Sequence, residues 1–508
     1  MISANGVIIV AIVLYMAIII CIGAKYSKKS KTIDDFYLGG RKLGPFVTAM
    51  SAEASDMSSW LLMGLPGVAL AGSIAEASWT AIGLAVGTYI NWLIVAKRLR
   101  VYTEKTNSIT IPDFFSNRYR DDKCILMAIS AIIIAVFFIP YTASGFAACG
   151  KLFSTLFGWD YFWAMLISAI IIIIYTTLGG FLAASTTDFL QSIIMTIALI
   201  VVLVFGISNA GGISSVVSNA KSLEGYFSLT SFNMWGGDGI GSYDALTIAS
   251  TLAWGLGYFG MPHILLRFMA IKDKQKITLS RRIASVWVVI SMFIAIAIGV
   301  IGYSLVKNGV VTGLEDSERI IVAIAKIISQ YGVFFAFVAG IIISGILAST
   351  MSTADSQLLA ASSSISQNIF KGIIAKNISD KKIMVISRIS LIVISVIAIF
   401  IAANPNSSVF RVVSFAWAGF GASFGPVVLF ALFWKRSNKW GALAGMVVGG
   451  AMVFIWKYLV APLGGIFAIY ELLPAFICAS IAIVVVSLLT PAPEKEIVEE
   501  FKTISSNI

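Results

Sequence analysis

The chain has 508 residues, of which 58% are hydrophobic and only 12% are charged, and this composition excludes a soluble globular protein. Its mean hydropathy of +0.93 is typical of a protein that crosses a membrane many times. The formal net charge of +11 does not indicate a nucleic acid partner, because the basic residues lie in short segments between apolar runs, where membrane topology explains them better.

Apolar runs long enough to cross a bilayer, at a threshold of ~18 residues each, predict about thirteen transmembrane helices. We therefore expect an all-α polytopic protein embedded in the lipid bilayer. In chain order the runs cover residues 7–25, 45–72, 76–96, 124–149, 161–179, 184–206, 246–270, 283–306, 334–368, 382–403, 409–433, 440–459 and 467–489.

The distribution of lysine and arginine predicts the orientation of these spans. The apolar stretch that opens the first run, Val7 to Ile22, lacks a basic leader and is followed by Lys25, which favours a retained helix with its N-terminus outside. Short loops rich in Lys and Arg stay on the cytoplasmic side of a membrane. Threading the spans places the basic segments 28–42, 97–105, 272–282, 371–382 and 435–439 inside. The sequence thus predicts a multi-pass protein of the cytoplasmic membrane with a cytoplasmic C-terminus.

The run 45–72 contains an acidic residue, Asp56, within a stretch of Ala, Ser and Gly. An ionised carboxylate is costly in hydrocarbon, so it is expected to face protein or water, where a cation compensates it. Gly64, Pro66 and Gly67 weaken the helix and can free backbone carbonyl groups. The alternative is a proline kink with glycines that serve packing. The first hypothesis is cation transport.

A second polar span, residues 344–356, has many hydroxyl side chains and one carboxylate, Asp355. Neutral oxygen ligands with at most one carboxylate suit sodium, whereas divalent sites gather several carboxylates. Close helix packing by small residues is the alternative explanation.

In a third span, residues 254–263, aromatic residues alternate with glycines before Pro262. Such a segment can grip a small apolar ring and offer free backbone groups to a carboxylate or an ammonium.

Other chemistry finds little support in the sequence. His263 is the only histidine, and we find neither a Walker A pattern nor an HExxH pattern. The four cysteines are scattered without the spacing of a metal or redox site. We therefore expect no enzyme, no transition metal, no cofactor and no obligatory protein partner, and an ion gradient as the driving force.

Several blocks, in order along nearly the whole chain, resemble the sodium:solute symporter family, and within it the bacterial members that carry proline. The matching blocks are residues 38–41 (LGGR), 43–45 (LGP), 54–58 (ASDMS), 62–67 (LMGLPG), 255–260 (GLGYFG) and 416–421 (AWAGFG).

This resemblance implies a leucine-transporter-type core of two five-helix repeats with opposite membrane orientations and a binding site between them. The expected parts are residues 1–44 as the first transmembrane helix and a cytoplasmic loop, 45–206 as the first repeat, 246–433 as the inverted second repeat, 434–489 as two additional helices and 490–508 as a cytoplasmic tail. The implied function is sodium-coupled uptake of L-proline by alternating access, with one sodium ion per proline.

The resemblance also implies roles for single residues. Sodium is expected to bind the carbonyl oxygens of Ala54, Met57 and Ser349 and the hydroxyl groups of Ser352 and Thr353. Asp56 matches an acidic residue needed for sodium coupling, and Asp188 matches one on the sodium path. The expected proline contacts are Tyr141, Trp254, Tyr258 and Pro262.

Two positions depart from the family pattern, which has glycine where this chain has Glu53 and Ser59. Glu53 adds a carboxylate one turn before Asp56 and can be protonated, pair with a cation, or change the choice of ion or substrate. Both residues are possible modifiers of the site. A symporter for another amino acid, a sugar or a carboxylate is therefore the alternative function, followed by a channel or a sensor. Sodium, proton and lithium remain alternatives as the coupling ion.

Overall fold

The computed structural model describes residues 3–27, 32–233, 240–375 and 377–506. The basic residues Lys28, Lys29 and Lys31, which the topology prediction places inside, lie outside these ranges. The helices and strands are α1 Ala4–Ser27, α2 Ile33–Leu38, α3 Pro45–Asp56, α4 Leu65–Ala71, α5 Ile74–Ile90, α6 Ala96–Lys105, α7 Ile111–Arg118, α8 Ile125–Phe157, α9 Tyr161–Gly179, α10 Phe181–Asn209, α11 Ile213–Lys221, β1 Ser231–Asn233, β2 Ile240–Ser242, α12 Ala245–Leu252, α13 Pro262–Ala270, α14 Ile277–Lys307, α15 Ile320–Ile328, α16 Val333–Ser363, α17 Asp380–Ala402, α18 Val409–Phe433, α19 Lys439–Ile455, α20 Leu472–Leu489 and α21 Lys495–Ser506.

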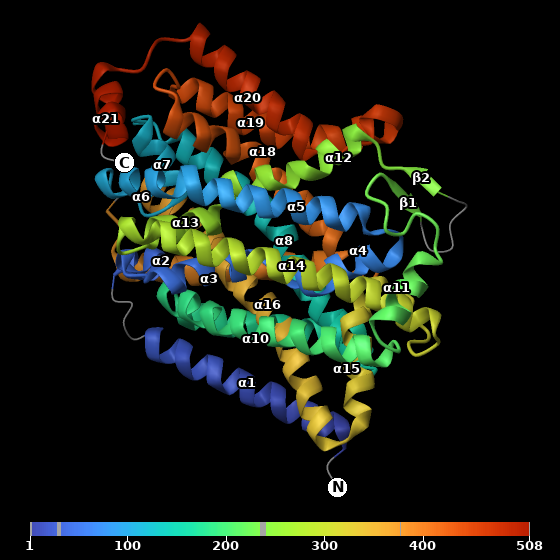
Figure 1. The fold of residues 1–508 in the computed structure, drawn as a ribbon. Helices are drawn as coiled ribbons and strands as arrows, with labels where there is room; N and C mark the ends of the chain where they lie inside the picture. The colour runs from blue at the N-terminus through green and yellow to red at the C-terminus, as the bar shows by residue number, and fades with distance from the viewer. Residues whose placement is uncertain (1–2, 28–31, 234–239, 376, 507–508) are drawn as a thin grey trace.

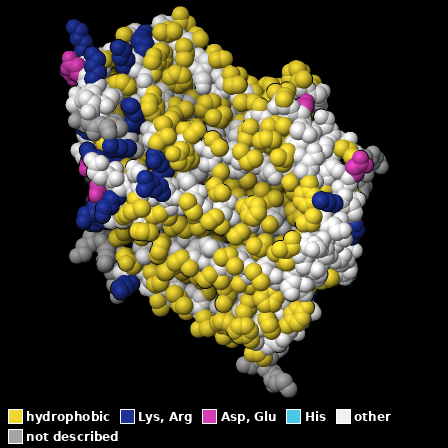
Figure 2. Space-filling view, in the orientation of Figure 1, with side chains coloured by type: hydrophobic (Ala, Val, Ile, Leu, Met, Phe, Trp, Pro, Cys, Tyr) yellow, Lys and Arg dark blue, Asp and Glu magenta, His cyan; other side chains and the backbone are white. Residues whose placement is uncertain are grey.

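Long helices lie side by side and form one bundle, with α3, α8 and α16 in its interior (Figure 1). Apolar side chains cover the middle of the visible face, whereas Lys and Arg gather at the end where α2, α6, α7 and α21 lie (Figure 2). An apolar belt with a basic rim is the surface expected of a protein that spans a bilayer.

Ten helical stretches within the described residues are long and apolar enough to cross a membrane. The predicted count of thirteen is not confirmed. Three of the predicted spans appear only as shorter apolar helices, Trp60–Ala71, Tyr161–Thr177 and Ala245–Phe259. Two of these belong to the runs 45–72 and 246–270, because each of those runs is interrupted part of the way along its length.

The first interruption separates α3 from the next helical turn. α3 ends at Asp56, and Met57 has the non-helical backbone angles φ −74° and ψ 67°. The Ser58 amide donates back to the Asp56 carbonyl (2.8 Å), and the Trp60 amide donates to the Ser58 hydroxyl (3.4 Å). Serine favours such local bonds over a continuous helix. The break thus lies at residues 57–59 and not at Gly64, Pro66 and Gly67, which continue the chain as helix.

The second interruption has the aromatic and glycine residues that the sequence singles out. After α12, residues Ala253–Phe259 form a 3₁₀-helix, and Pro262 then opens α13 at its first turn. Proline is well tolerated at that position, because the amide it lacks has no partner there in a helix. Each of the two predicted repeats therefore begins with a broken helix.

The glycines of α5 let this helix touch the second broken segment backbone to backbone. A Cβ atom at Gly87 would overlap the carbonyl oxygen and the Cα of Gly255, and one at Gly83 would overlap the carbonyl oxygen of Leu252. These neighbours are main-chain atoms, which cannot swing aside as a flexible side chain does. The side chains of Asn91 and Trp92, in the π-helical turn Asn91–Val95, then bond to the two broken segments.

We expect Gly87→Ala to lower the melting temperature of the purified protein, because overpacking costs about 1–3 kcal/mol or more where the backbone cannot shift. Gly44→Ala is the matched control, since a Cβ atom at Gly44 meets nothing within 4 Å. Thermal unfolding followed by size exclusion measures both variants. Equal melting temperatures for Gly87→Ala and Gly44→Ala would contradict the tight contact between α5 and the 3₁₀ segment.

Two small elements modify the all-α prediction and the expected tail. Strands β1 and β2 form an antiparallel hairpin in the connection between α11 and α12, with Phe232 opposite Gly241. The C-terminal segment forms α21, in which Ile497 and Ile504 are buried and Arg120 pairs with Glu496. The tail after Pro491 is thus partly packed against the bundle and not fully solvated.

Candidate functional site

The free end of α3 meets the hydroxyl-rich part of α16, and several oxygen atoms converge there. The Ser352 hydroxyl lies 2.8 Å from the carbonyl oxygen of Ala54 and 3.2 Å from that of Ser349. The Thr353 hydroxyl lies 3.5 Å from the same Ala54 oxygen. All four residues are buried. Because the last carbonyl groups of a helix lack intrahelical partners and carry partial negative charge, this cluster is suited to a small cation.

Asp56, the last residue of α3, connects these oxygens to the aromatic residues. The hydroxyl of Tyr258 donates to Asp56 Oδ2 (2.7 Å), and Tyr141 donates to the Asp56 carbonyl oxygen (3.2 Å), which also accepts from Trp60 Nε1 (2.9 Å). Asp56 is fully buried, and its Oδ1 has no hydrogen-bond partner among the described residues. A buried carboxylate with an unpartnered oxygen calls for a positive charge nearby.

Trp254 lies at the centre of a group of aromatic rings. Its ring centroid lies 5.3–6.1 Å from those of Trp60, Phe410, Trp417 and Tyr470. The Trp417 indole also donates to the Trp254 carbonyl oxygen (2.7 Å). Aromatic faces offer contact area to a flat apolar ring and attract a cation by their quadrupole. This aromatic cluster, defined by these five residues, therefore provides a surface suited to a small amino acid.

The remaining predicted residues of this group lie nearby. Met57 follows the end of α3, and its amide donates to the Glu53 carbonyl oxygen (2.7 Å). Pro262 is buried at the start of α13, next to His263, whose ring centroid lies 6.4 Å from that of Tyr141. The structure thus brings the predicted sodium residues and the predicted proline contacts to the same two helix breaks.

Asp188, on α10, lies apart from Asp56 and pairs with an arginine. Arg267 Nη2 lies 3.1 Å from Asp188 Oδ2, which also accepts from the Ser51 hydroxyl (2.7 Å). Arg267 donates to the Ser356 hydroxyl (2.5 Å), and Ser356 in turn donates to the Ser352 carbonyl oxygen (2.8 Å). Asp188 is therefore linked to the oxygen cluster through Arg267 and one turn of α16.

The two departures from the family pattern both face the interior. Glu53 is 1% exposed, and its Oε1 accepts from Thr88 (3.1 Å) and from Trp92 Nε1 (3.0 Å). Its Oε2 and the hydroxyl of Ser59 have no hydrogen-bond partner among the described residues. Since residues three apart share a helix face, Glu53 lies on the same side of α3 as Asp56. The additional carboxylate thus anchors the first half of the broken helix to the end of α5.

Sequence reasoning missed several residues of the site. Trp60, Trp417 and Tyr470 complete the aromatic cluster but come from three distant segments, so no local pattern joins them. Arg267 did carry a signal, because a basic residue inside an apolar run is usually functional. It is 1% exposed, within the run 246–270.

Neutral oxygen atoms that converge where a helix is interrupted inside a membrane bundle are typical of a secondary transporter driven by a monovalent cation. The model of the sodium:solute symporter family matches residues 36–449. The chain belongs to this family, as the sequence predicts.

Curated relatives match over almost their whole length. The sodium/proline symporter of Salmonella typhimurium is 43% identical over 501 residues, which cover 97% of this chain and 95% of the relative. The high-affinity proline transporter PutP of Bacillus subtilis is 43% identical over 475 residues, 93% and 96% of the two chains. The osmoregulated proline transporter OpuE of the same organism is 41% identical over 490 residues, 96% of each chain.

Solved structures confirm the predicted leucine-transporter-type fold. A sodium-coupled sialic acid symporter in a substrate-bound, outward-open state has a TM-score of 0.78 at 18% identity, with 96% of this chain and 99% of that one covered. Mhp1, a transporter of the nucleobase-cation-symport-1 family, has a TM-score of 0.54 at 12% identity, with 94% and 99% covered. At these identities the likeness concerns the fold alone.

Proposed function

We propose that this protein takes up L-proline across the cytoplasmic membrane together with sodium, by alternating access and with one sodium ion per proline. The full-length identity of 41–43% to proline transporters supports the substrate. The observation that carries the ion coupling is the approach of the Ser352 hydroxyl to the carbonyl oxygens of Ala54 (2.8 Å) and Ser349 (3.2 Å), which ties the end of α3 to α16.

In this proposal sodium binds the carbonyl oxygens of Ala54, Met57 and Ser349 and the hydroxyl groups of Ser352 and Thr353. The single hydroxyl proton of Ser352 is shared between the carbonyl oxygens of Ala54 and Ser349. A bound cation contacts both of these oxygens in place of that proton. The ion therefore strengthens the contact between α3 and α16. An ion that favours one arrangement of these helices shifts the protein toward that conformation, and this differential affinity is the basis of coupling.

Proline is placed against the aromatic cluster, beside the ion. Trp254 and Tyr258 contact the ring, Tyr141 and Pro262 line the other side, and the broken helix ends offer backbone groups to the carboxylate and the ammonium. The Tyr258 hydroxyl donates to the Asp56 carboxylate (2.7 Å). A shift of Asp56 when sodium binds therefore also moves Tyr258 in the substrate pocket. Asp188 and Arg267 lie on the path by which sodium leaves.

The sodium gradient and the membrane potential together provide enough free energy to accumulate proline from a dilute solution. One charge moving through ~100 mV contributes about 2.3 kcal/mol, and a tenfold sodium gradient adds about 1.4 kcal/mol. The total of roughly 3.7 kcal/mol corresponds to accumulation by several hundredfold.

We place the N-terminus outside and the C-terminus in the cytoplasm, which the gathering of Lys and Arg around α2, α6, α7 and α21 supports (Figure 2).

Uptake of labelled proline into proteoliposomes tests the function. We expect accumulation when sodium is present outside, and none when potassium replaces sodium. Lithium and a proton gradient are tested in the same way. Excess unlabelled amino acids, sugars and carboxylates are the competitors, since another solute is the main alternative. Accumulation of a competitor in place of proline would reassign the substrate, and equilibration without accumulation would indicate a channel.

A change at Thr353 tests the proposed sodium ligands. We expect Thr353→Ala to raise the sodium concentration for half-maximal uptake about 5- to 10-fold, since a lost oxygen contact costs roughly 1–1.5 kcal/mol. Thr350→Ala is the matched control, because the Thr350 hydroxyl bonds within its own helix, to the Ile346 carbonyl oxygen (3.0 Å). Sodium titration of uptake measures both variants, and an equal shift in the two would remove Thr353 from the ion site.

A further inference from the structure

The end of α5 contacts both helix breaks at once. There the chain forms the π-helical turn Asn91–Val95, which follows α5 directly. Single π-helical turns inside α-helices are rare and occur frequently at functional sites. The side chains of Asn91 and Trp92 are both buried in this turn. Neither residue belongs to the proposed sodium or proline contacts, so this buried polar turn needs a different role.

Trp92 and Thr88 hold the carboxylate of Glu53 from one face of α5. Trp92 Nε1 (3.0 Å) and the Thr88 hydroxyl (3.1 Å) both donate to Glu53 Oε1. Residues four apart lie on the same face of a helix, so the two donors converge on one oxygen. The ring of Trp92 packs on that of Phe268, at a centroid distance of 4.4 Å. These contacts fix the direction of the Glu53 side chain, because both donors belong to one helix.

Glu53 precedes a proposed sodium ligand. The carbonyl oxygen of Ala54 accepts from Ser352 (2.8 Å), and that of Glu53 accepts from the Met57 amide (2.7 Å). The last carbonyl groups of a helix lack intrahelical partners, and helix ends fray. An anchored Glu53 therefore keeps the Ala54 carbonyl oxygen in place. Ligand atoms that are already in place bind an ion more tightly, because less ordering is needed when it binds.

Asn91 connects the same turn to the second helix break. Its Nδ2 donates to the Tyr258 carbonyl oxygen in the 3₁₀ segment (3.0 Å). The hydroxyl of Tyr258 in turn donates to Asp56 Oδ2 (2.7 Å), at the end of α3. A closed ring of contacts thus runs from α3 to the end of α5, on to the 3₁₀ segment and back to α3.

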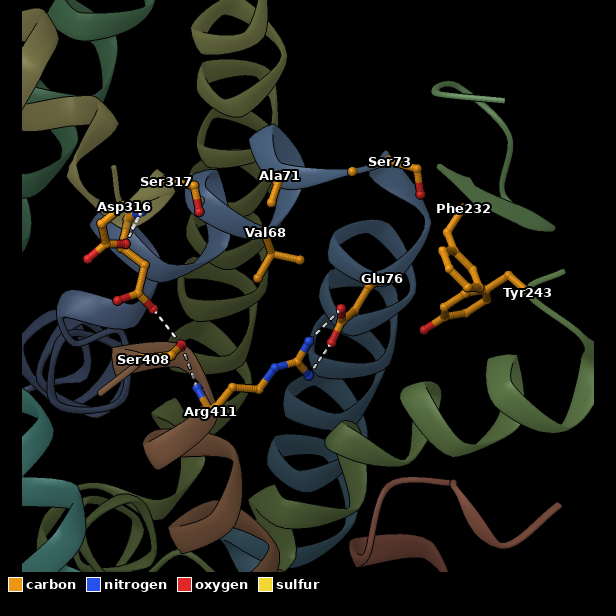
Figure 3. Close-up of a pocket in the computed structure, with 13 residues that line it drawn as sticks. Val68, Ala71, Ser73, Glu76, Phe232, Tyr243, Asp316, Ser317, Ser408 and Arg411 are labelled. Carbon is orange, nitrogen blue, oxygen red and sulfur yellow. Dashed lines mark hydrogen bonds and ion pairs between the residues drawn. The ribbon is translucent and has the colours of Figure 1, made fainter. Parts of the chain in front are cut away.

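Other contacts hold the rest of α5. At its first turn, Glu76 accepts from both terminal nitrogens of Arg411 on α18 (2.6 and 2.9 Å; Figure 3). Further along, Gly83 and Gly87 pack against main-chain atoms of residues 252–255. Because α5 is held along its length, a displacement of one helix break is transmitted to the other and is not absorbed by a local adjustment of α5.

We propose that Glu53, Trp92 and Asn91 are positioning residues that couple the sodium site to the proline site through the end of α5. Glu53 and Trp92 keep the Ala54 carbonyl oxygen directed at the ion, and Asn91 connects the position of α5 to the Tyr258 backbone. In this proposal none of the three positioning residues contacts either ligand. The identities of the ligands rest on the proposed function, whereas the link between the two helix breaks does not.

Glu53→Gln separates this positioning role from a role as an ion ligand. Glu53 Oε2 has no hydrogen-bond partner among the described residues, so an ion ligand is the competing role. An ion ligand needs the negative charge, whereas the positioning role needs only an acceptor oxygen, which glutamine also has. We expect Glu53→Leu to raise the sodium concentration for half-maximal uptake about 10-fold and Glu53→Gln to raise it less than about 3-fold. An equal rise in the two variants would overturn the positioning role.

The coupling is measured as the ratio of the half-saturating proline concentrations at low and at saturating sodium. We expect Trp92→Phe, which keeps a ring against Phe268, and Asn91→Leu to lower this ratio about 3- to 10-fold. Trp79→Phe is the matched control, because Trp79 lies on the same helix and its Nε1 donates to the Leu229 carbonyl oxygen (2.8 Å). An unchanged ratio in Trp92→Phe and Asn91→Leu, or an equal decrease in Trp79→Phe, would overturn the proposal.

A double-mutant cycle tests whether Glu53 and Trp92 act through their shared bond. We expect the combined effect of Glu53→Leu and Trp92→Phe on sodium half-saturation to be smaller than the product of the single effects. Independent effects would overturn the link. Thr88→Val removes the other donor and replaces Trp92→Phe if that variant is not recovered from the membrane.

Calorimetric titration of the purified protein with sodium alone measures the same variants without proline. If the unaltered protein binds sodium but accumulates no proline, the proposed function fails, whereas the effect of Glu53 and Trp92 on sodium affinity still decides the positioning role. Unchanged sodium affinity in Glu53→Leu would overturn that role even where proline uptake is intact. Failure of the positioning role and failure of the proposed function are thus distinguished.

Discussion

Replacement of Asp56 by asparagine is expected to raise the sodium concentration for half-maximal uptake by about 10- to 100-fold, because loss of a charged partner in a buried site costs roughly 1.5–3 kcal/mol. Asparagine keeps the size of the side chain and an oxygen that can accept from Tyr258, which now lies 2.7 Å from Asp56 Oδ2. The fold is therefore expected to survive. Uptake of labelled proline over a range of sodium concentrations measures the shift.

A second Asp→Asn variant controls for the chemical change itself. Asp160 caps the start of α9, where it accepts from the Phe162 and Trp163 amides (3.1 and 3.2 Å). Asparagine caps a helix about as well as aspartate, so Asp160→Asn is expected to leave the sodium dependence unchanged. Uptake by Asp56→Asn with the original sodium dependence would show that Asp56 has no part in coupling.

Replacement of Trp254 by alanine is expected to raise the half-saturating concentration of proline by about 10- to 100-fold, since the lost aromatic contact area corresponds to roughly 1.5–3 kcal/mol. Sodium binding should remain measurable, because no predicted sodium ligand comes from Trp254. The half-saturating proline concentration of Trp254→Phe should lie between those of Trp254→Ala and the unaltered protein. Phenylalanine keeps a ring among Trp60, Phe410, Trp417 and Tyr470.

The matched control for Trp254→Ala is Trp163→Ala, since Trp163 is 60% exposed on the outside of α9 and should affect proline uptake little. Calorimetry with sodium and, separately, with proline resolves the two ligands. An unchanged proline affinity in Trp254→Ala would place the substrate away from the aromatic cluster. Loss of sodium binding in the same variant would mean that the change disturbs the ion site as well.

Much of the fold could be predicted, because a bilayer imposes length and hydropathy on every span. Most of the thirteen predicted runs correspond to continuous helices, and the runs 45–72 and 246–270 are the ones that fail. The glycine and proline residues in these two runs did predict helix breaks. The predicted position of the first break was wrong. Pro66 lies near the start of a helix and stabilises it, whereas the local bonds of Ser58 follow the end of α3 at Asp56.

The candidate site was predicted in its parts but not in its connections. Hydroxyl density pointed to a sodium site on residues 344–356, the family resemblance named Ser352 and Thr353 within it, and the apolar setting pointed to Asp56. The bond of Tyr258 to Asp56 and the ion pair of Arg267 with Asp188 join residues 202 and 79 positions apart. Such pairs depend on how the bundle closes, which periodicity and composition do not encode.

The interruption after Asp56 has an evolutionary consequence. In the proposed ion shell, Ala54, Met57 and Ser349 contribute main-chain oxygen atoms, which every residue type possesses. Point mutation cannot delete these ligands as long as the local path of the chain is kept. The surface proposed for the ring of the substrate, by contrast, consists of side chains. A lineage with this architecture can therefore change its transported substrate by exchanging aromatic residues, while its coupling to the ion gradient is inherited unchanged.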